Sequence, residues 1–296
     1  MIAIGLCVDR AYLVPALVTL VSFADSHDAA IRRSMSVRLL SPDLRRGEAQ
    51  AIETIVRKLG FLSADFRRVG PPPFAPIIHG KYISKATYLR FEFDAGFVRE
   101  PFLLYLDSDL MIMGDMTEPF NYLQKACVGA VRDEIIQEIG REDALPGFDT
   151  KYPQFRGQPY FNAGVLWFHA TTLKATNTGC KKALLRREHI HFNDQDALNI
   201  WLTESRSWFC VPGRFNRLEL ARFLQESDWI KSVTESLPKD DGTTAVHFVG
   251  PLKPWLSCCP SVSGVQLYQG LLHTTLRLLG RLRNATLDLM RRRPDD

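Results

Sequence analysis

Short apolar runs alternate with amphipathic stretches along most of this sequence, and no other feature limits the possible folds as strongly. Residues Ile2–Val8 form a continuous apolar run that ends at Asp9, as expected of a strand buried on both faces. A stretch with helical periodicity, Tyr12–Ala24, follows, and the same order returns at Met35–Leu40 and Arg45–Leu59. This repeated order of strand and helix predicts an α/β fold with a mostly parallel central sheet flanked by helices.

The rest of the chain continues the pattern less regularly. Further strands are expected at Phe102–Leu106, Val165–Phe168 and Ala245–Val249, and further helices at Ser84–Asp94 and Asp194–Leu202. Residues 138–161 hold many glycines, prolines and charged residues, which predicts either a functional loop or a disordered segment. Together with residues 215–235, this loop is expected to shape an acceptor site.

The C-terminal stretch differs in composition from the rest of the chain. Between residues 265 and 293, leucines recur near helical spacing beside six arginines and a single aspartate. A basic amphipathic helix of this kind can lie in an anionic membrane surface, and we favour this over a helix packed on the domain with solvated arginines. We therefore predict a catalytic domain of residues 1–260 and a basic amphipathic helical tail of residues 261–296.

Charge, cysteine content and the N-terminus limit the class of protein. The net charge of +4 is small, and the arginines of the tail are interleaved with leucine instead of stacking aromatics, so we expect no nucleic-acid partner. Six cysteines form no C-x-x-C pair, which indicates neither a zinc site nor a disulfide framework. The first residues lack a basic region ahead of the apolar run, unlike a signal peptide. We predict a cytoplasmic protein, peripheral at the inner face of the membrane through its tail.

The first cluster with chemical potential is Asp107-Ser108-Asp109, directly after the strand expected at Phe102–Leu106. Ligands of open α/β sheets collect at the carboxyl ends of strands. Two carboxylates two positions apart can hold one hard divalent cation, which would neutralise a diphosphate. The triplet alone is weak evidence, because it also occurs in solvated turns and helix caps.

A second cluster, His247 to Trp255, follows the last expected strand. His247 could complete the protein ligands of the metal, and oxygen ligands with one imidazole suit Mn²⁺, with Mg²⁺ as the alternative. Lys253, between Gly250-Pro251 and Pro254, could place a charge on phosphate oxygens. A lone histidine is more often a hydrogen-bonded core residue, but the acid pair and the lysine favour the metal site.

Five motifs in order give the sequence a family resemblance. They are Asp107-x-Asp109, Phe161-Asn162-Ala163-Gly164-Val165, Asn193-Asp194-Gln195-Asp196, Arg214-Phe215-Asn216 and His247-x-x-Gly250-Pro251-x-Lys253-Pro254-Trp255. Over Ile2 to about Trp255 the chain resembles glycosyltransferase family eight, which holds retaining enzymes such as bacterial lipopolysaccharide galactosyl- and glucosyltransferases and the glycogenins. The resemblance implies a GT-A fold, a UDP-hexose donor, Mn²⁺, and a glycan or glycolipid acceptor such as the lipopolysaccharide core.

The resemblance also implies roles for individual residues. The metal ligands would be Asp107, Asp109 and His247. Contacts to the donor would come from Asp9 and Tyr12 at the uracil, from Lys253 at the diphosphate, and from Arg90, Ser108, Asn162, Ala163 and Gly250. The group around the reacting hexose would be Asp133, Asp194 and Gln195.

Several positions keep a second interpretation. Ala11 stands where the family usually has Asn, so the alternative function is a catalytically weak member that only binds a UDP-sugar. Asp194 could be a helix cap and Arg90 a surface ion pair. Trp255 is favoured as a packing anchor over a sugar platform. A phosphatase is disfavoured because Leu110-Met111 follows Asp109, and no phosphate-loop or dinucleotide motif is present.

Retention of the donor's anomeric configuration can follow two routes. A covalent route needs an oxygen under the anomeric carbon, and Gln195 is the positional candidate. An amide is a poor nucleophile, so we favour attack by the acceptor on the same face from which UDP leaves.

Overall fold

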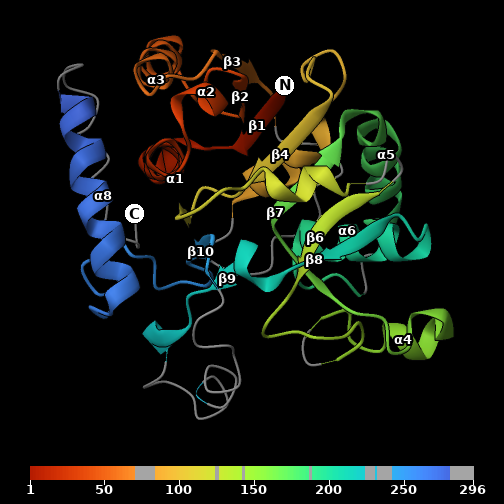
Figure 1. Ribbon diagram of the computed structural model, residues 1–296. Helices are drawn as coiled ribbons and strands as arrows, with labels where there is room; N and C mark the ends of the chain where they lie inside the picture. Colours follow the sequence, from red (N-terminus) through yellow and green to blue (C-terminus); the bar gives the residue numbers. More distant parts are fainter. Residues whose placement is uncertain are drawn as a thin grey trace.

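The computed structural model describes residues 1–70, 84–123, 127–141, 144–186, 189–223, 231 and 242–280. Its main sheet has the strand order β3-β2-β1-β4-β7-β6-β8 (Figure 1). The strands are β1 Ile2–Cys7, β2 Met35–Ser41, β3 Ser63–Arg68, β4 Phe102–Leu106, β6 Val128–Arg132, β7 Phe161–His169 and β8 Trp208–Val211. Strand β7 is antiparallel to both neighbours and the other pairs are parallel, which confirms the predicted α/β fold with a mostly parallel sheet.

Helices cover both faces of this sheet (Figure 1). Helices α1 Leu13–Ser26 and α3 Arg46–Lys58 pack on one face, and α5 Leu173–Ala183 and α6 Asn193–Glu204 pack on the other. Successive residues of β4 enter opposite cores: Leu104 contributes to the α1 side and Tyr105 to the α6 side. Burial on both faces is why the strands read as continuous apolar runs in the sequence.

Short helices connect these elements. The α-helical turns are α2 Ala29–Arg32 and α4 Phe148–Lys151. The 3-10 helices are η1 Arg10–Tyr12, η2 Lys85–Glu92, η3 Glu118–Asn121, η4 Pro153–Phe155, η5 Ala170–Thr172, η7 Gly213–Phe215 and η8 Ala221–Phe223.

A second, three-stranded sheet joins distant parts of the sequence. Its strands are β5 Leu110–Ile112, β10 Ala245–His247 and β9 Arg217–Leu218, in the order β5-β10-β9. Strand β10 is antiparallel to β5, and His247 lies opposite Leu110. The backbone N–H of Phe248 also donates to the carbonyl of Asp109 at 3.0 Å. This pairing therefore places His247 directly beside the Asp107–Asp109 turn.

Hydroxyl groups on α1 hold the same turn from the other side. The Thr19 hydroxyl donates to the carbonyls of Ser108 and Leu110, at 3.1 and 2.9 Å. The Ser22 hydroxyl accepts from the Ile112 N–H at 3.0 Å, and the Ser26 hydroxyl donates to the Ile112 carbonyl at 2.8 Å. Because β5 is flanked by α1 and not by another strand on this side, these side chains supply the hydrogen bonds that a strand would give.

Three sequence-based expectations differ from the structure in detail. The helix expected at Ser84–Asp94 is the 3-10 helix η2, capped by the Ser84 hydroxyl. The strand expected to begin at Val165 begins at Phe161, because Phe161 and Asn162 already pair with β6. The loop at residues 138–161 contains α4 and η4, and Phe148 and Phe155 are fully buried there.

The described part of the C-terminal stretch is one helix, α8 Ser263–Gly280, which runs alongside α1 (Figure 1). Its Val265 and Tyr268 are fully buried with Val18 of α1 and with Phe248. Residues 281–296, which hold most arginines of the predicted tail, lie outside the described residues. Among the helices that are described, none combines the length and the apolar character needed to cross a bilayer.

The hydroxyl row on α1 gives a stability prediction. Replacing Thr19 with valine keeps the shape of the side chain but removes the donor to two buried carbonyls. We expect the unfolding free energy in urea to fall by about 1–3 kcal/mol. Thr54→Val is the matched control, since the Thr54 hydroxyl bonds only the Gln50 carbonyl on the exposed face of α3, and it should change stability by at most about 0.5 kcal/mol. Equal effects of the two substitutions would show that α1 does not hold this turn.

Candidate active site

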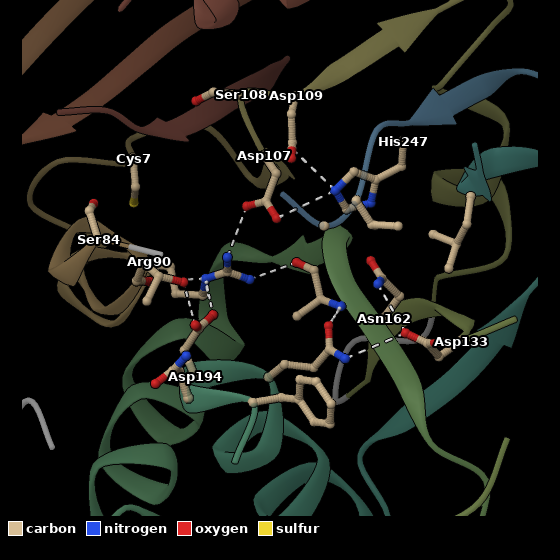
Figure 2. Close-up of a pocket in the computed structure, with 18 of the residues that line it drawn as sticks. Cys7, Ser84, Arg90, Asp107, Ser108, Asp109, Asp133, Asn162, Asp194 and His247 are labelled. Carbon is tan, nitrogen blue, oxygen red and sulfur yellow. Dashed lines mark hydrogen bonds and ion pairs between the residues drawn. The ribbon is translucent and has the colours of Figure 1, made fainter. Parts of the chain in front are cut away.

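One cavity of about 650 Å³ lies where the carboxyl ends of β1 and β4 meet the start of β7 and the second sheet. Figure 2 shows part of its lining. Every residue to which the sequence analysis assigned a site role lines this cavity: Asp9, Tyr12, Arg90, Asp107, Ser108, Asp109, Asp133, Asn162, Ala163, Asp194, Gln195, His247, Gly250 and Lys253. The sequence motifs therefore converge on one place.

Asp107, Asp109 and His247 form a cluster with the geometry of a metal site. Nε2 of His247 lies 3.1 Å from Oδ1 of Asp109 and 4.0 Å from Oδ2 of Asp107 (Figure 2). Ligands about 2.1 Å from one octahedral ion are about 3 Å apart when adjacent and about 4 Å when opposite. These three side chains thus fit one divalent cation. Among the described residues, they form the one group of His, Cys, Asp or Glu side chains whose ligand atoms lie close enough together to hold a metal ion.

Lys253 lies against the same cluster. Its ammonium group bonds Oδ2 of Asp109 and also donates to the carbonyl of Phe248 at 2.8 Å. Burial alone would raise the pKa of Asp109, but the Lys253 ammonium and the His247 imidazole outweigh it and hold that pKa well below its usual range. Gly250 has φ +78°, and this left-handed turn brings Lys253 back to the acid pair.

Arg90 joins the acid pair to Asp194 (Figure 2). Its guanidinium contacts Asp107 at 2.9 Å, Asp194 at 2.7 Å and the Ala163 carbonyl at 2.6 Å. Arg90 is 7% exposed, so the interpretation as a surface ion pair is wrong. Asp194 is not the cap of α6, because Phe192 occupies that position and the Asp194 carboxylate contacts Arg90 and Thr87. Burial raises the pKa of Asp194, and Arg90 opposes this shift.

Asp133, Asn162 and Gln195 form a polar wall at the start of β7. The amide nitrogen of Asn162 donates to Oδ2 of Asp133 at 3.0 Å. The amide oxygen of Gln195 accepts from the Ala163 N–H at 2.9 Å, and its nitrogen lies 3.5 Å from Oδ2 of Asp133. Asp133 directly follows β6, and the antiparallel β6–β7 pairing brings it beside Asn162 of β7, while Gln195 comes from α6.

Asp9 and Tyr12, the residues predicted from the family resemblance to bind the uracil, are held by a hydrogen bond and by aromatic packing. Asp9 caps η1 by accepting the N–H of Tyr12 at 3.0 Å. The Tyr12 ring packs edge-on against Trp255 at 5.5 Å between centroids, and Trp255 contacts Tyr268 of α8 at 5.8 Å. These contacts fit Trp255 as a packing anchor.

Sequence reasoning gave no role to two residues that shape the metal cluster. Gly164 lies under the His247 ring, and a Cβ at position 164 would be 2.2 Å from Cε1 of His247. Asn216 accepts from Nδ1 of His247 at 3.1 Å. Both lie inside recognised motifs, but a glycine and an asparagine there could equally have been turn residues.

An apolar wall of the cavity was also missed, because isolated apolar residues carry no sequence signal. It consists of Ile135, Ile136, Phe192, Leu218, Leu220 and Phe223. The last three fall in the region 215–235 that was expected to shape the acceptor site. None of the described residues in the loop 138–161 lines the cavity.

Chemically, the arrangement can hold a divalent cation and a diphosphate together. Buried carboxylates supply hard ligands, and Lys253 and Arg90 balance their charge when no cation is bound. Asp133, Asn162 and Gln195 line the same cavity as this charged cluster.

Comparison with known sequences gives a consistent picture. The profile described as glycosyl transferase family 8 matches residues 3–259. The glycosyltransferase GlyF of Streptococcus pneumoniae is 25% identical over 262 residues, and the lipopolysaccharide 1,3-galactosyltransferase of Salmonella typhimurium is 28% identical over 183 residues. These alignments cover 86% and 58% of this chain. The chain spans 57% and 50% of the length of these two relatives.

Comparison with solved structures shows the same fold. The galactosyltransferase LgtC, in complex with donor and acceptor sugar analogues, superposes with a TM-score of 0.70 at 20% identity, covering 93% of this chain and 96% of that one. GlyE of Streptococcus pneumoniae superposes with a TM-score of 0.65 at 18% identity, covering 95% of this chain and 63% of that one. These likenesses confirm the predicted GT-A fold.

The contact between Gly164 and His247 gives a prediction for metal binding. In Gly164→Ala the new methyl group must push the imidazole away from the acid pair. We expect the affinity for Mn²⁺, measured by titration calorimetry, to fall by about tenfold or more. Gly47→Ala is the matched control, because nothing lies within 4 Å of a Cβ there, and it should leave the affinity unchanged. Wild-type affinity in folded Gly164→Ala would show that the ring position does not matter.

Proposed function

This chain belongs to glycosyl transferase family 8, and we propose that it is a retaining hexosyltransferase that uses a UDP-sugar. The proposed donor is UDP-galactose or UDP-glucose, and the proposed acceptor is a glycan or glycolipid such as the lipopolysaccharide core. The proposed cofactor is Mn²⁺, with Mg²⁺ as the alternative. Relatives named as lipopolysaccharide glucosyl- and galactosyltransferases support this choice of chemistry.

One observation carries the proposal. Asp107, Asp109 and His247 form a possible metal site, and Lys253 lines the same cavity. Breaking the bond between the sugar and UDP develops negative charge on the diphosphate. A divalent cation would supply Lewis-acid stabilisation of that charge. Lys253, whose ammonium already lies at Asp109, is placed to share the charge of a bound diphosphate.

Other side chains would orient the donor. Tyr12, held by Trp255, offers an aromatic face for the uracil, and Asp9 lines the cavity beside it. Arg90 fixes Asp107 and Asp194 relative to each other, so its role would be to order the acidic residues around the sugar. Ser108, Ala163 and Gly250 would contact the donor through the groups they expose to the cavity.

The contacts of Gln195 favour same-face attack over a covalent intermediate. Its amide oxygen already accepts the Ala163 N–H, and its nitrogen points toward Asp133. An amide oxygen engaged in this way is a poor nucleophile. We propose that Gln195, Asp133 and Asp194 hold the hexose and stabilise positive charge on it, while the leaving phosphate takes the acceptor's proton.

The acceptor would enter along the apolar wall. Leu218, Leu220 and Phe223 offer a surface for the C–H face of a sugar ring or for an apolar part of a glycolipid. A lipid-linked acceptor would also explain the basic C-terminal sequence. We propose that residues 281–296 hold the enzyme at the inner, anionic face of the membrane.

Release of UDP tests the proposed activity. UDP-galactose and UDP-glucose are incubated with Mn²⁺, with Mg²⁺ and with EDTA, and free UDP is measured with and without a glycan acceptor. We expect release that depends on the metal and rises with acceptor. Asp109→Asn should lower the rate on the order of 100-fold, whereas Asp115→Asn, outside the cavity, should not.

The outcomes separate the proposal from its alternative. Metal-dependent binding of UDP without turnover on any UDP-sugar would indicate a catalytically weak member that acts as a UDP-sugar-binding protein. Release of UDP that is unaffected by EDTA would contradict a metal-dependent transferase.

The proposed membrane contact has its own test. Deleting residues 281–296 leaves α8 intact and removes five arginines, each worth about 1 kcal/mol at an anionic surface. The full chain should sediment with vesicles containing phosphatidylglycerol, the shortened chain should stay in the supernatant, and neither should sediment with phosphatidylcholine. Unchanged sedimentation after the deletion would exclude this role.

A further inference from the structure

A chain of side-chain hydrogen bonds runs from Asp133 to His247 through two asparagines. Asn162 donates from its amide nitrogen to Oδ2 of Asp133 at 3.0 Å. Asn216 donates from its amide nitrogen to Oδ1 of Asn162 at 2.9 Å, and its own oxygen lies 3.1 Å from Nδ1 of His247. The chain thus links the predicted hexose wall to the predicted metal cluster.

The direction of these hydrogen bonds is fixed at the Asp133 end. Oδ1 of Asp133 accepts the backbone N–H groups of Ile135 and Ile136, both at 2.9 Å, which leaves Oδ2 as the acceptor for Asn162. The backbone N–H of Gly164 donates to Oδ1 of Asn162 at 2.9 Å. A backbone N–H can only donate, so the Asn162 amide satisfies both neighbours in a single orientation.

This orientation passes to the next amide. Because Oδ1 of Asn162 is an acceptor, Asn216 must turn its nitrogen toward it and its oxygen toward His247. Asn162, Asn216 and His247 are 6%, 1% and 4% exposed, so water cannot readily replace a mismatched partner. A reversed Asn216 amide would leave two buried acceptor oxygens, its own Oδ1 and that of Asn162, facing each other, which is costly.

Asn216 fixes the state of one nitrogen of the imidazole, Nδ1. Asn216 presents an oxygen, so Nδ1 of His247 must hold a proton. The other nitrogen, Nε2, faces Asp107 and Asp109. Gly164 supports the face of the ring, which fixes its tilt.

We propose that Asn216 and Asn162 are positioning residues that set the proton on Nδ1 of His247 and so reserve Nε2 for the divalent cation. Asp133 sets the direction of the whole chain, although it makes none of the contacts to the metal cluster. This inference rests on the proposed metal-dependent function. Partners of this kind around metal ligands typically change metal affinity about 10–100-fold.

The first test measures the ring protons of His247 directly in the wild-type protein, and it uses one variant only to assign the signal. Long-range ¹H–¹⁵N correlation spectra of the metal-free protein, labelled with ¹⁵N-histidine, report which ring nitrogens carry protons. His247→Gln identifies the His247 signal among the seven histidines. We expect a proton on Nδ1 of His247. An unprotonated Nδ1 in the wild-type protein would overturn the proposal.

The second test compares two substitutions of Asn216. Leucine has the same branching but no polar atom, whereas aspartate keeps an oxygen that accepts from Nδ1. We expect Asn216→Leu to lower the affinity for Mn²⁺ by about tenfold or more. Asn216→Asp keeps the acceptor for Nδ1 and loses only the donor to Asn162, so it should lower the affinity by less than Asn216→Leu. The ring signal should lose its Nδ1 preference only in Asn216→Leu. Equal affinities of the two folded variants would mean that Asn216 merely fills space.

Asp133→Asn serves if Asn216→Leu does not fold. Its amide oxygen must face the two backbone N–H groups, so its nitrogen meets the nitrogen of Asn162. We expect weaker Mn²⁺ binding, by about tenfold, together with a changed His247 ring signal. Weaker binding with an unchanged ring signal would reflect lost charge alone and would contradict transmission through the amides.

These readouts also separate the inference from the proposed function. Absence of Mn²⁺ binding by the wild-type protein, with or without UDP, would refute the proposed metal-dependent activity. It would also leave the hydrogen bonds from Asp133 to His247 without the proposed role in metal binding. Metal binding by the wild type with no response in any variant would refute the positioning role alone.

Discussion

Burial of negative charge is the constraint on which this structure depends. Asp107, Asp109 and Asp194 lie at the ends of packed elements, and Asp109 and Asp194 are 8% and 4% exposed. Unpaired carboxylates in such places would cost several kcal/mol each. Arg90 and Lys253 therefore accompany them, and the elements that carry these cations must dock in one arrangement. The same ion pairs hold together the residues of the proposed cation and diphosphate site.

This constraint explains why so many elements converge on one cavity. The parallel strands β1 and β4 deliver Asp9 and Asp107 at the same edge, as open α/β sheets do. The second sheet adds His247, because β10 pairs with β5 immediately after Asp109. Helix α1 supports that turn from behind through the Thr19 hydroxyl. Ligands far apart in sequence are thus held by backbone pairing, which is stiffer than a loop.

The sequence predicted the structure best where a residue pattern has a single common structural meaning. Continuous apolar runs predicted strands β1, β2 and β4 closely, and carboxylates after β4 predicted an acidic edge. The sequence motifs also assigned Lys253 and His247 to one site, and both line the same cavity. Strands β3, β5, β6, β8 and β9 were missed. Strands β3 and β8 are not fully buried apolar runs, and β5 and β9 have only three and two residues. Strand β6 is a buried run that is interrupted by Gly129 and ends in Arg132.

Other features could not be predicted because their meaning is geometric. Position 164 requires glycine because a Cβ there would collide with the His247 ring. That contact depends on how the main sheet, which carries Gly164, packs against the second sheet, which carries His247. Asn216 could have been a turn residue, since its partner His247 lies on a different strand. The apolar wall combines residues from β9, from η8, from the N-cap of α6 and from loops, and no local sequence pattern joins them.

We propose that Asp107, Asp109 and His247 together bind one divalent cation. Anomalous scattering at the manganese absorption edge, from crystals grown with Mn²⁺ and UDP, tests this proposal directly. We expect a single strong peak bonded to a carboxylate oxygen of each aspartate and to Nε2 of His247, with the diphosphate on the same ion. A peak bonded to other residues, or bound UDP without any peak in this cluster, would contradict it.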